Sequence, residues 1–170
     1  MKKGVDIRPF TNDDIGRISK IANDRRISDN LRDTFPHPYT HQDSEFFITE
    51  IVANQNPLEN FAVCSDDVLV GTIGIHPLHD VYRNTGELGY WIGVDYWGQG
   101  IISKAIPLML NYGFNTVGYH RIEAGVFDYN QGSIKALERN GFTLEGILRE
   151  QAIKNGKFMD IHMYAKLKNN

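Results

Sequence analysis

Apolar and polar residues recur with two different periods along this 170-residue chain. Residues 5–9 alternate at strand spacing and end at a proline, which is poorly tolerated inside a strand. Thr11, a residue type that caps helix N-termini, then precedes isoleucines at helical spacing over residues 15–21. The pattern predicts a strand and then a helix that ends near residue 23.

A second helix is predicted to start at residue 40 or 43, after a break. Residues 35–39 contain two prolines, each of which lacks an amide donor and restricts its neighbour, so they cannot form a regular helix. The side chains expected to point inward from the second helix are Phe46, Phe47, Ile51 and Val52.

Beyond residue 57 the pattern becomes that of strands. Residues 61–64 and 68–76 flank a turn-rich tripeptide and predict a hairpin, and Asn155-Gly156 marks a second hairpin turn. The remaining predicted strands are 85–94 and 120–126, and the predicted helices between strands are 101–114 and 133–139. Strands and helices interleave without a strict repeat. We therefore expect one α/β domain over residues 1–170, a mixed sheet with helices packed on it.

Composition narrows the class of protein. The single cysteine, Cys64, cannot form an internal disulfide, which is typical of a reducing compartment. The first residues soon reach Asp6 and Pro9, and no apolar run is long enough to span a membrane. A net charge of −3 argues against a sequence-independent grip on nucleic acid. We expect a cytoplasmic protein without nucleic-acid or membrane partners.

Residues 90–103 hold the most informative motif. A strand is predicted to end there, Gly98 and Gly100 form a tight turn, and a helix opens at once. Free amides and the positive end of the dipole at a helix start bind anions, and glycines let a phosphate approach the main chain. Neither a nucleotide P-loop nor a dinucleotide fingerprint is present. By itself, such a turn is as often structural as ligand-binding.

Several blocks together resemble the GNAT superfamily of N-acetyltransferases. They are residues 86–92, 97–100, 130–133 and 140–146. Residues 35–40 and 163–165 further resemble the RimJ/RimL group, which acetylates protein N-termini, including ribosomal ones. The resemblance covers nearly the whole chain, in the family's order and spacing.

The resemblance implies a mostly antiparallel sheet whose fourth and fifth strands splay apart, with acetyl-CoA as cosubstrate and no metal. Pantetheine would pair with the main chain in the gap, and pyrophosphate would bind the glycine turn. The implied coenzyme contacts are Trp91, Ile92, Val94, Gly98, Gln99, Gly100, Ile101, Ser103, Asn130 and Ser133.

Three positions depart from the family pattern. Asp95 stands where the glycine motif commonly opens with Arg or Gln, and Leu137 replaces a tyrosine that acts as the thiolate's acid in many relatives. Some ribosomal-protein members place a carboxylate in the strand after Gly146. Here the matching position is Ala152, with Glu150 nearby.

Acetyl transfer requires a neutral amine, a polarised carbonyl and a leaving group that accepts a proton. Glu87 is the candidate base, directly or through a water, because it is a carboxylate in an otherwise apolar strand, on the same face as Gly89 and Trp91. A cross-strand ion pair is the alternative role. Amides near residues 92–94 are candidate oxyanion donors.

Ser133 is the candidate donor to the leaving sulfur, although a helix cap is an equally good interpretation. Tyr129 and Tyr164 are secondary candidate acids that are more commonly packing aromatics. The six histidines lack metal-ligand spacing, and Cys64 lies in an apolar strand without a paired histidine, so we expect neither a metal site nor a thiol nucleophile.

The leading functional hypothesis is acetylation of a protein or peptide N-terminus near residues 32–39 and the last hairpin. Two alternatives stay open: a small-amine acetyltransferase for an aminoglycoside, polyamine or metabolite, and a non-catalytic acyl-CoA-binding module. The oligomeric state is also open, with a homodimer among the options.

Overall fold

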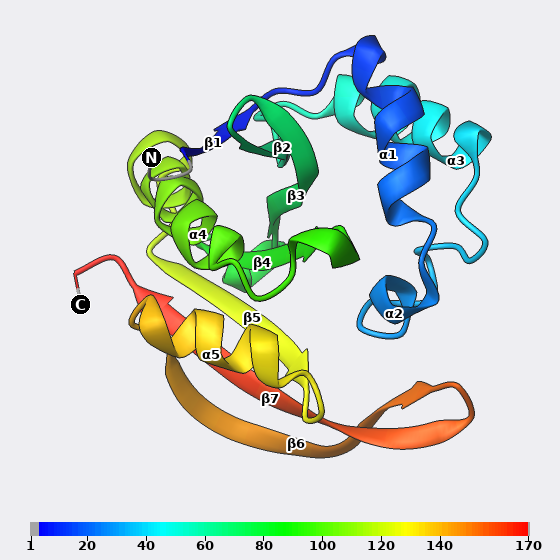
Figure 1. Ribbon diagram of the computed structural model, residues 1–170. Helices are drawn as coiled ribbons and strands as arrows, with labels where there is room; N and C mark the ends of the chain where they lie inside the picture. The colour runs from blue at the N-terminus through cyan, green and yellow to red at the C-terminus, as the bar shows by residue number, and fades with distance from the viewer. Residues whose placement is uncertain (1–3, 170) are drawn as a thin grey trace.

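A seven-stranded sheet in the order β1-β2-β3-β4-β5-β7-β6 runs through the protein (Figure 1). The computed structural model describes residues 4–169. All neighbouring strands pair antiparallel except β4 and β5. The strands are β1 Val5–Arg8, β2 Asn60–Ser65, β3 Val68–Pro77, β4 Thr85–Ile92, β5 Arg121–Phe127, β6 Thr143–Lys154 and β7 Lys157–Leu167.

Helices cover both faces of this sheet, α4 and α5 on one and α1 and α3 on the other (Figure 1). The α-helices are α1 Ile15–Ala22, α2 Arg25–Ser28, α3 His41–Phe46, α4 Ile101–Asn111 and α5 Gln131–Arg139. Two π-helical segments continue α3 and α4, η2 Phe47–Ile51 and η6 Tyr112–Val117. Short 3-10 turns are η1 Asn12–Asp14, η3 Val52–Asn54, η4 Asp80–Tyr82 and η5 Val94–Tyr96. The predicted α/β class is confirmed.

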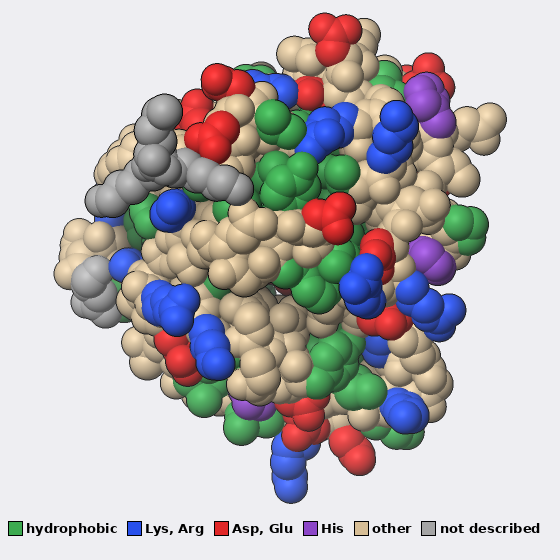
Figure 2. Space-filling model, viewed as in Figure 1, with side chains coloured by type: hydrophobic (Ala, Val, Ile, Leu, Met, Phe, Trp, Pro, Cys, Tyr) green, Lys and Arg blue, Asp and Glu red, His purple; other side chains and the backbone are tan. Residues whose placement is uncertain are grey.

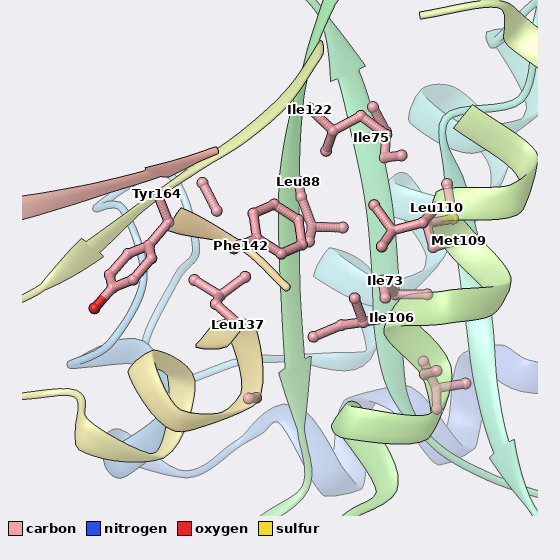
Figure 3. Close-up of a cluster of buried hydrophobic side chains, with 14 of the residues drawn as sticks. Ile73, Ile75, Leu88, Ile106, Met109, Leu110, Ile122, Leu137, Phe142 and Tyr164 are labelled. Atoms are coloured by element: carbon pink, nitrogen blue, oxygen red, sulfur yellow. The ribbon is translucent and has the colours of Figure 1, made fainter. Parts of the chain in front are cut away.

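The two helical layers bury two separate apolar clusters. The larger one joins α4 and α5 to the sheet, with Ile106, Met109 and Leu137 fully buried (Figure 3). The smaller one packs α1 and η2, the continuation of α3, against β2 and β3, around Ile18 and Cys64. Each strand in the middle of the sheet therefore has an apolar side chain on both faces, as the near-continuous apolar pattern of β2 indicates.

The parallel pair β4 and β5 separates soon after it forms. Only Thr85–Glu87 pair with Arg121–Glu123, and no further register is formed between the two strands. Gly86, the middle β4 residue of this pairing, lies so close to β3 that a Cβ there would be 2.3 Å from the Ile75 side chain. The splay that the sequence implied is therefore present, and it opens the sheet at its centre.

One predicted helix face is wrong. Phe46 and Ile51 were expected to point inward, yet their side chains are 58% and 42% exposed. The wider π turn of η2 shifts the phase of the helix, so that Ser44 and Ile48 face inward in their place. Val52 is buried and Phe47 is half-buried against the smaller cluster, as expected.

Candidate functional site

Two cavities meet where β4 and β5 separate. The first, of about 940 Å³, lies between the splayed strands and the starts of α4 and α5. The second, of about 810 Å³, lies on the α1 and α3 side of the sheet. Gly89 and Tyr90 of β4 and Gly125 and Phe127 of β5 line both. At Gly89 a Cβ would have no atom within 4 Å, so the missing side chain leaves this junction open.

The glycine turn forms one end of the first cavity. Gly98 and Gly100 both adopt φ of +72°, a conformation that favours glycine, and Gly100 is the N-cap of α4. Ile101 and Ser103 in the first turn of α4 also line the cavity. Amides at the start of α4 lack partners inside the helix, so this end of the cavity suits an anion.

Most of the predicted coenzyme contacts lie together around this cavity. It is lined by Trp91, Ile92, Gly98, Gly100, Ile101, Ser103, Asn130 and Ser133. Val94 and Gln99 are not part of its lining. The Gln99 amide instead donates to the Asp95 carbonyl at 3.0 Å, which places that side chain along the outside of the turn.

Two main-chain groups near the proposed oxyanion site already have partners. The Gly93 amide donates to the Val70 carbonyl at 2.8 Å, so it does not serve as an oxyanion donor in this conformation. The Ile92 carbonyl accepts from the Trp97 indole at 2.8 Å. Val94 lines neither cavity, so of the three amides considered only that of Ile92 remains as a candidate.

Basic side chains at the first cavity were not identified from the sequence. Arg26, Lys135 and Arg139 line it, the last two one helical turn apart on α5. Arg26 also pairs with Asp24 at 2.6 Å, and Figure 2 shows basic and acidic side chains side by side around α2. The i and i+4 spacing on α5 is the signal that could have found two of them. These cations suit a ligand with several phosphates.

Ser133 lies in the first cavity with a partner that sequence reasoning missed. Its hydroxyl is 2.7 Å from the hydroxyl of Tyr90, and its amide donates to the Asn130 side chain at 3.2 Å. Ser133 is therefore not the cap of α5, because Asn130 is. Burial raises the pKa of Tyr90 to about 12, so this phenol stays protonated at neutral pH. Strand alternation from Glu87 could have placed Tyr90 toward α5.

Of the two secondary acid candidates, Tyr129 lines the first cavity and Tyr164 does not. The Tyr164 hydroxyl donates to Glu138 at 3.0 Å, and the residue lines neither cavity. Its ring packs in the larger core with its hydroxyl directed away (Figure 3). Tyr129 lines the first cavity, stacks on Phe127 and donates to the Asp29 carbonyl. Leu137 is fully buried in the core.

Glu87 lies in the second cavity together with Gly89 and Trp91, on the face that alternation predicted. Its carboxylate accepts from the Arg32 guanidinium, a partner in the loop after α2. Glu87 thus forms an ion pair, but its partner is in a loop 55 residues earlier in the chain and not in a neighbouring strand as the alternative role supposed. Among the two positions considered after Gly146, Ala152 lines the second cavity and Glu150 does not.

Within residues 4–169 no cluster of three or more His, Cys, Asp or Glu side chains has the arrangement of a metal site. His76 lines the second cavity and contacts Glu59 through Nδ1 at 3.0 Å. Cys64 is buried, and burial raises the pKa of its thiol, which agrees with a packing role. No helix in this part of the chain is long and apolar enough to cross a membrane.

Comparisons with known proteins agree with this geometry. The family described as "Acetyltransferase (GNAT) domain" matches residues 5–143. The chain is 38% identical over 103 residues to the probable N-acetyltransferase YjcK of Bacillus subtilis. This alignment covers 61% of the chain and 57% of YjcK. The chain is 30% identical over 107 residues to the ribosomal-protein-serine acetyltransferase of Escherichia coli, covering 63% of this chain and 59% of that protein.

Each of these matches spans less than two thirds of the relative's length. A solved structure of Mycobacterium smegmatis RimJ in complex with CoA-disulfide is 26% identical, with a TM-score of 0.82 over 96% of this chain and 81% of that one. The overall arrangement of elements is therefore similar to that of a protein solved in complex with a CoA disulfide.

Proposed function

The chain belongs to the GNAT acetyltransferase family, and we propose that it transfers the acetyl group of acetyl-CoA to the α-amine of a protein or peptide N-terminus. One observation carries the proposal. A cavity with an anion-binding helix start and a cavity with a carboxylate meet at the gap between β4 and β5, next to Tyr90 and Ser133. A thioester in the first cavity and an amine in the second would meet at this gap.

Two features of the first cavity support coenzyme A as its ligand, the groups that can bind phosphates and the unpaired stretch of β4. The start of α4 offers amides for a pyrophosphate, and Lys135 and Arg139 offer cations for phosphate oxygens. Beyond residue 87, β4 pairs with no strand on its β5 side, so its main-chain groups there can pair with the amides of pantetheine, except the Ile92 carbonyl, which accepts from the Trp97 indole. The coenzyme would supply the activated acetyl group.

Glu87 would remove the proton from the acceptor. An α-ammonium has a pKa of about 8 and a lysine ammonium about 10.4, while carboxylates are weak bases. An N-terminal amine therefore needs less help from Glu87 than a lysine does. The neutral amine then attacks the thioester carbonyl carbon, and a new C–N bond forms.

Negative charge develops in turn on two atoms, the carbonyl oxygen in the tetrahedral intermediate and the sulfur as it leaves, and each needs a hydrogen-bond donor. The Ile92 amide is the candidate for the oxyanion, since the Gly93 amide donates to Val70 and Val94 lines neither cavity. When the C–S bond breaks, the hydroxyl pair of Tyr90 and Ser133 would donate a hydrogen bond to the leaving sulfur. A proton from solvent then completes the thiol product.

The acceptor class rests on two supports. The ribosomal-protein-serine acetyltransferase of Escherichia coli is named for a protein substrate. The second cavity is bordered by the loop residues Arg32, Thr34 and Phe35 and by Gln151 of β6, so a peptide chain has surface on either side to follow. We place the reaction in the cytoplasm, in keeping with the free, buried Cys64.

The substitution Glu87→Gln tests the proposal. Loss of a general base typically lowers turnover by about 10²- to 10⁴-fold, while acetyl-CoA affinity should not change because Glu87 lines the other cavity. Glu150→Gln, an exposed carboxylate outside both cavities, is the matched control and should keep full activity. Unchanged turnover in Glu87→Gln would contradict the assigned base, and a wild type that binds acetyl-CoA without acetylating any amine would favour the silent module.

A further inference from the structure

Arg32 holds Glu87 at the place where the proposed acceptor amine must bind. Its guanidinium donates through Nη2 to Oε1 of Glu87, and both residues line the second cavity. The Arg32 side chain is 76% exposed, while the Glu87 side chain is only 28% exposed. A cation from the surface therefore caps a carboxylate that lies further inside the cavity.

A neighbouring carboxylate is neutralised in a different way. Glu123 is paired with Glu87 in the β4–β5 register and lines the same cavity, but its partner is Arg121 on its own strand. Arg121 is also held by Glu145 at 2.6 Å and is only 25% exposed. Glu123 thus has a built-in structural counterion, whereas the counterion of Glu87 comes from a surface loop.

The loop that carries Arg32 is anchored on both sides of that residue. The Asp33 carboxylate accepts from Lys154 at 2.8 Å, and Asp29 accepts from Asn155 at 2.9 Å, both at the tip of the β6–β7 hairpin. These contacts hold the loop against the hairpin without using the Arg32 side chain. The guanidinium can therefore leave Glu87 while the loop stays in place.

We propose that the Arg32 guanidinium occupies the site of the acceptor ammonium, so that an acceptor binds by displacing it from Glu87. This inference rests on the proposed function, because it takes Glu87 as the group that receives the amine. The exchange replaces one cation by another and leaves the charge of the cavity unchanged.

Such an exchange makes an acceptor depend on contacts beyond its charge. An exposed ion pair is weak, so Arg32 is displaceable, yet a lone small ammonium gains little by replacing it. A peptide gains its further contacts along the loop and along Gln151 and Ala152 of β6. Arg32 would thereby lower the affinity of every acceptor by the same factor, and a peptide would still bind through these further contacts.

The test compares Arg32→Gln, Arg32→Lys and wild type for binding of a free N-terminal peptide to the enzyme–CoA complex by calorimetry. An exposed ion pair that competes with the acceptor weakens its apparent affinity by up to about fivefold, so Arg32→Gln should bind the peptide that much more tightly. Arg32→Lys should stay close to wild type. Arg25→Gln, which removes an equal charge outside both cavities, is the control.

The same peptide with an acetylated N-terminus should show no difference between wild type and Arg32→Gln. An unchanged affinity of the free peptide in Arg32→Gln overturns the proposal, and so does a weaker affinity, which would make Arg32 a direct acceptor contact. If wild type neither binds nor acetylates any amine, the proposed function itself fails. That result is distinguishable from an unchanged or weaker peptide affinity in Arg32→Gln, because in those two cases the wild-type enzyme still acetylates the peptide.

Discussion

The hydroxyl pair of Tyr90 and Ser133 gives the sharpest prediction about chemistry. Tyr90→Phe removes one oxygen and the 2.7 Å hydrogen bond but keeps the ring. Ser133→Ala removes the other oxygen, while the cap of α5 is kept because Asn130 supplies it. Both changes therefore alter the hydrogen bonding beside the leaving sulfur and leave the surrounding packing in place.

The expected magnitude follows from the pKa of Tyr90. Burial raises that pKa to about 12, whereas a free thiol has a pKa of about 8.5. Complete proton transfer from Tyr90 to the thiolate would be uphill by about 5 kcal/mol, so the pair stabilises the sulfur by a hydrogen bond. A hydrogen bond to a charged group contributes about 1.5–3 kcal/mol, which corresponds to a loss of roughly 10- to 100-fold in kcat.

The assay is thiol release from acetyl-CoA at saturating acceptor, with Tyr90→Phe, Ser133→Ala and the double variant. Because the two hydroxyls act as one unit, the kcat of the double variant should be about equal to that of the slower single variant. The fold-loss in Tyr90→Phe should stay constant from pH 7 to 9, since Tyr90 remains protonated there. A Tyr90→Phe enzyme with full kcat, or losses that multiply, would refute the assignment.

Three further predictions concern stability and the coenzyme. Gly98→Ala should cost about 1 kcal/mol, because φ is +72° there, and it should weaken acetyl-CoA binding in calorimetry. Burial raises the pKa of Asp14, but hydrogen bonds from Arg8 and Thr11 outweigh it and keep that pKa below its usual range. Asp14→Asn should therefore cost about 1–3 kcal/mol in urea unfolding at pH 7, and the cost should shrink as the pH falls and Asp14 is protonated. Burial raises the pKa of Tyr39 and Tyr90 from 10.0 to about 12, so unfolding free energy should fall between pH 10 and 12 by up to about 2.7 kcal/mol per tyrosine, and by less in Tyr90→Phe. A flat profile over that range would contradict the burial of the two phenols.

Local patterns predicted the strands and turns well because they depend on neighbouring residues. The positive φ angles of Asn155 and Gly156 follow from the hairpin turn that this dipeptide favours. Gly100 likewise takes the left-handed conformation that the turn before α4 requires. The strand splay, in contrast, was inferred only from the family resemblance, since no local pattern encodes which strands fail to pair.

The features that the sequence did not predict depend on contacts between distant segments or on irregular helices. The π turn of η2 changes the helical phase, so regular periodicity wrongly placed Phe46 and Ile51 inside. Helix α2 has four residues, too few for a periodic signal. The contact of Arg32 with Glu87 joins residues 55 positions apart, and only the folded loop brings them together.

The central claim is that the junction of the two cavities acetylates N-terminal α-amines. The most direct test measures thiol release from acetyl-CoA with one peptide in two forms, a free N-terminus and an N-terminally blocked form that keeps a lysine, beside spermidine and an aminoglycoside. The account predicts turnover with the free N-terminus only. Turnover with the blocked lysine peptide or the small amines, and none with the free N-terminus, would contradict it.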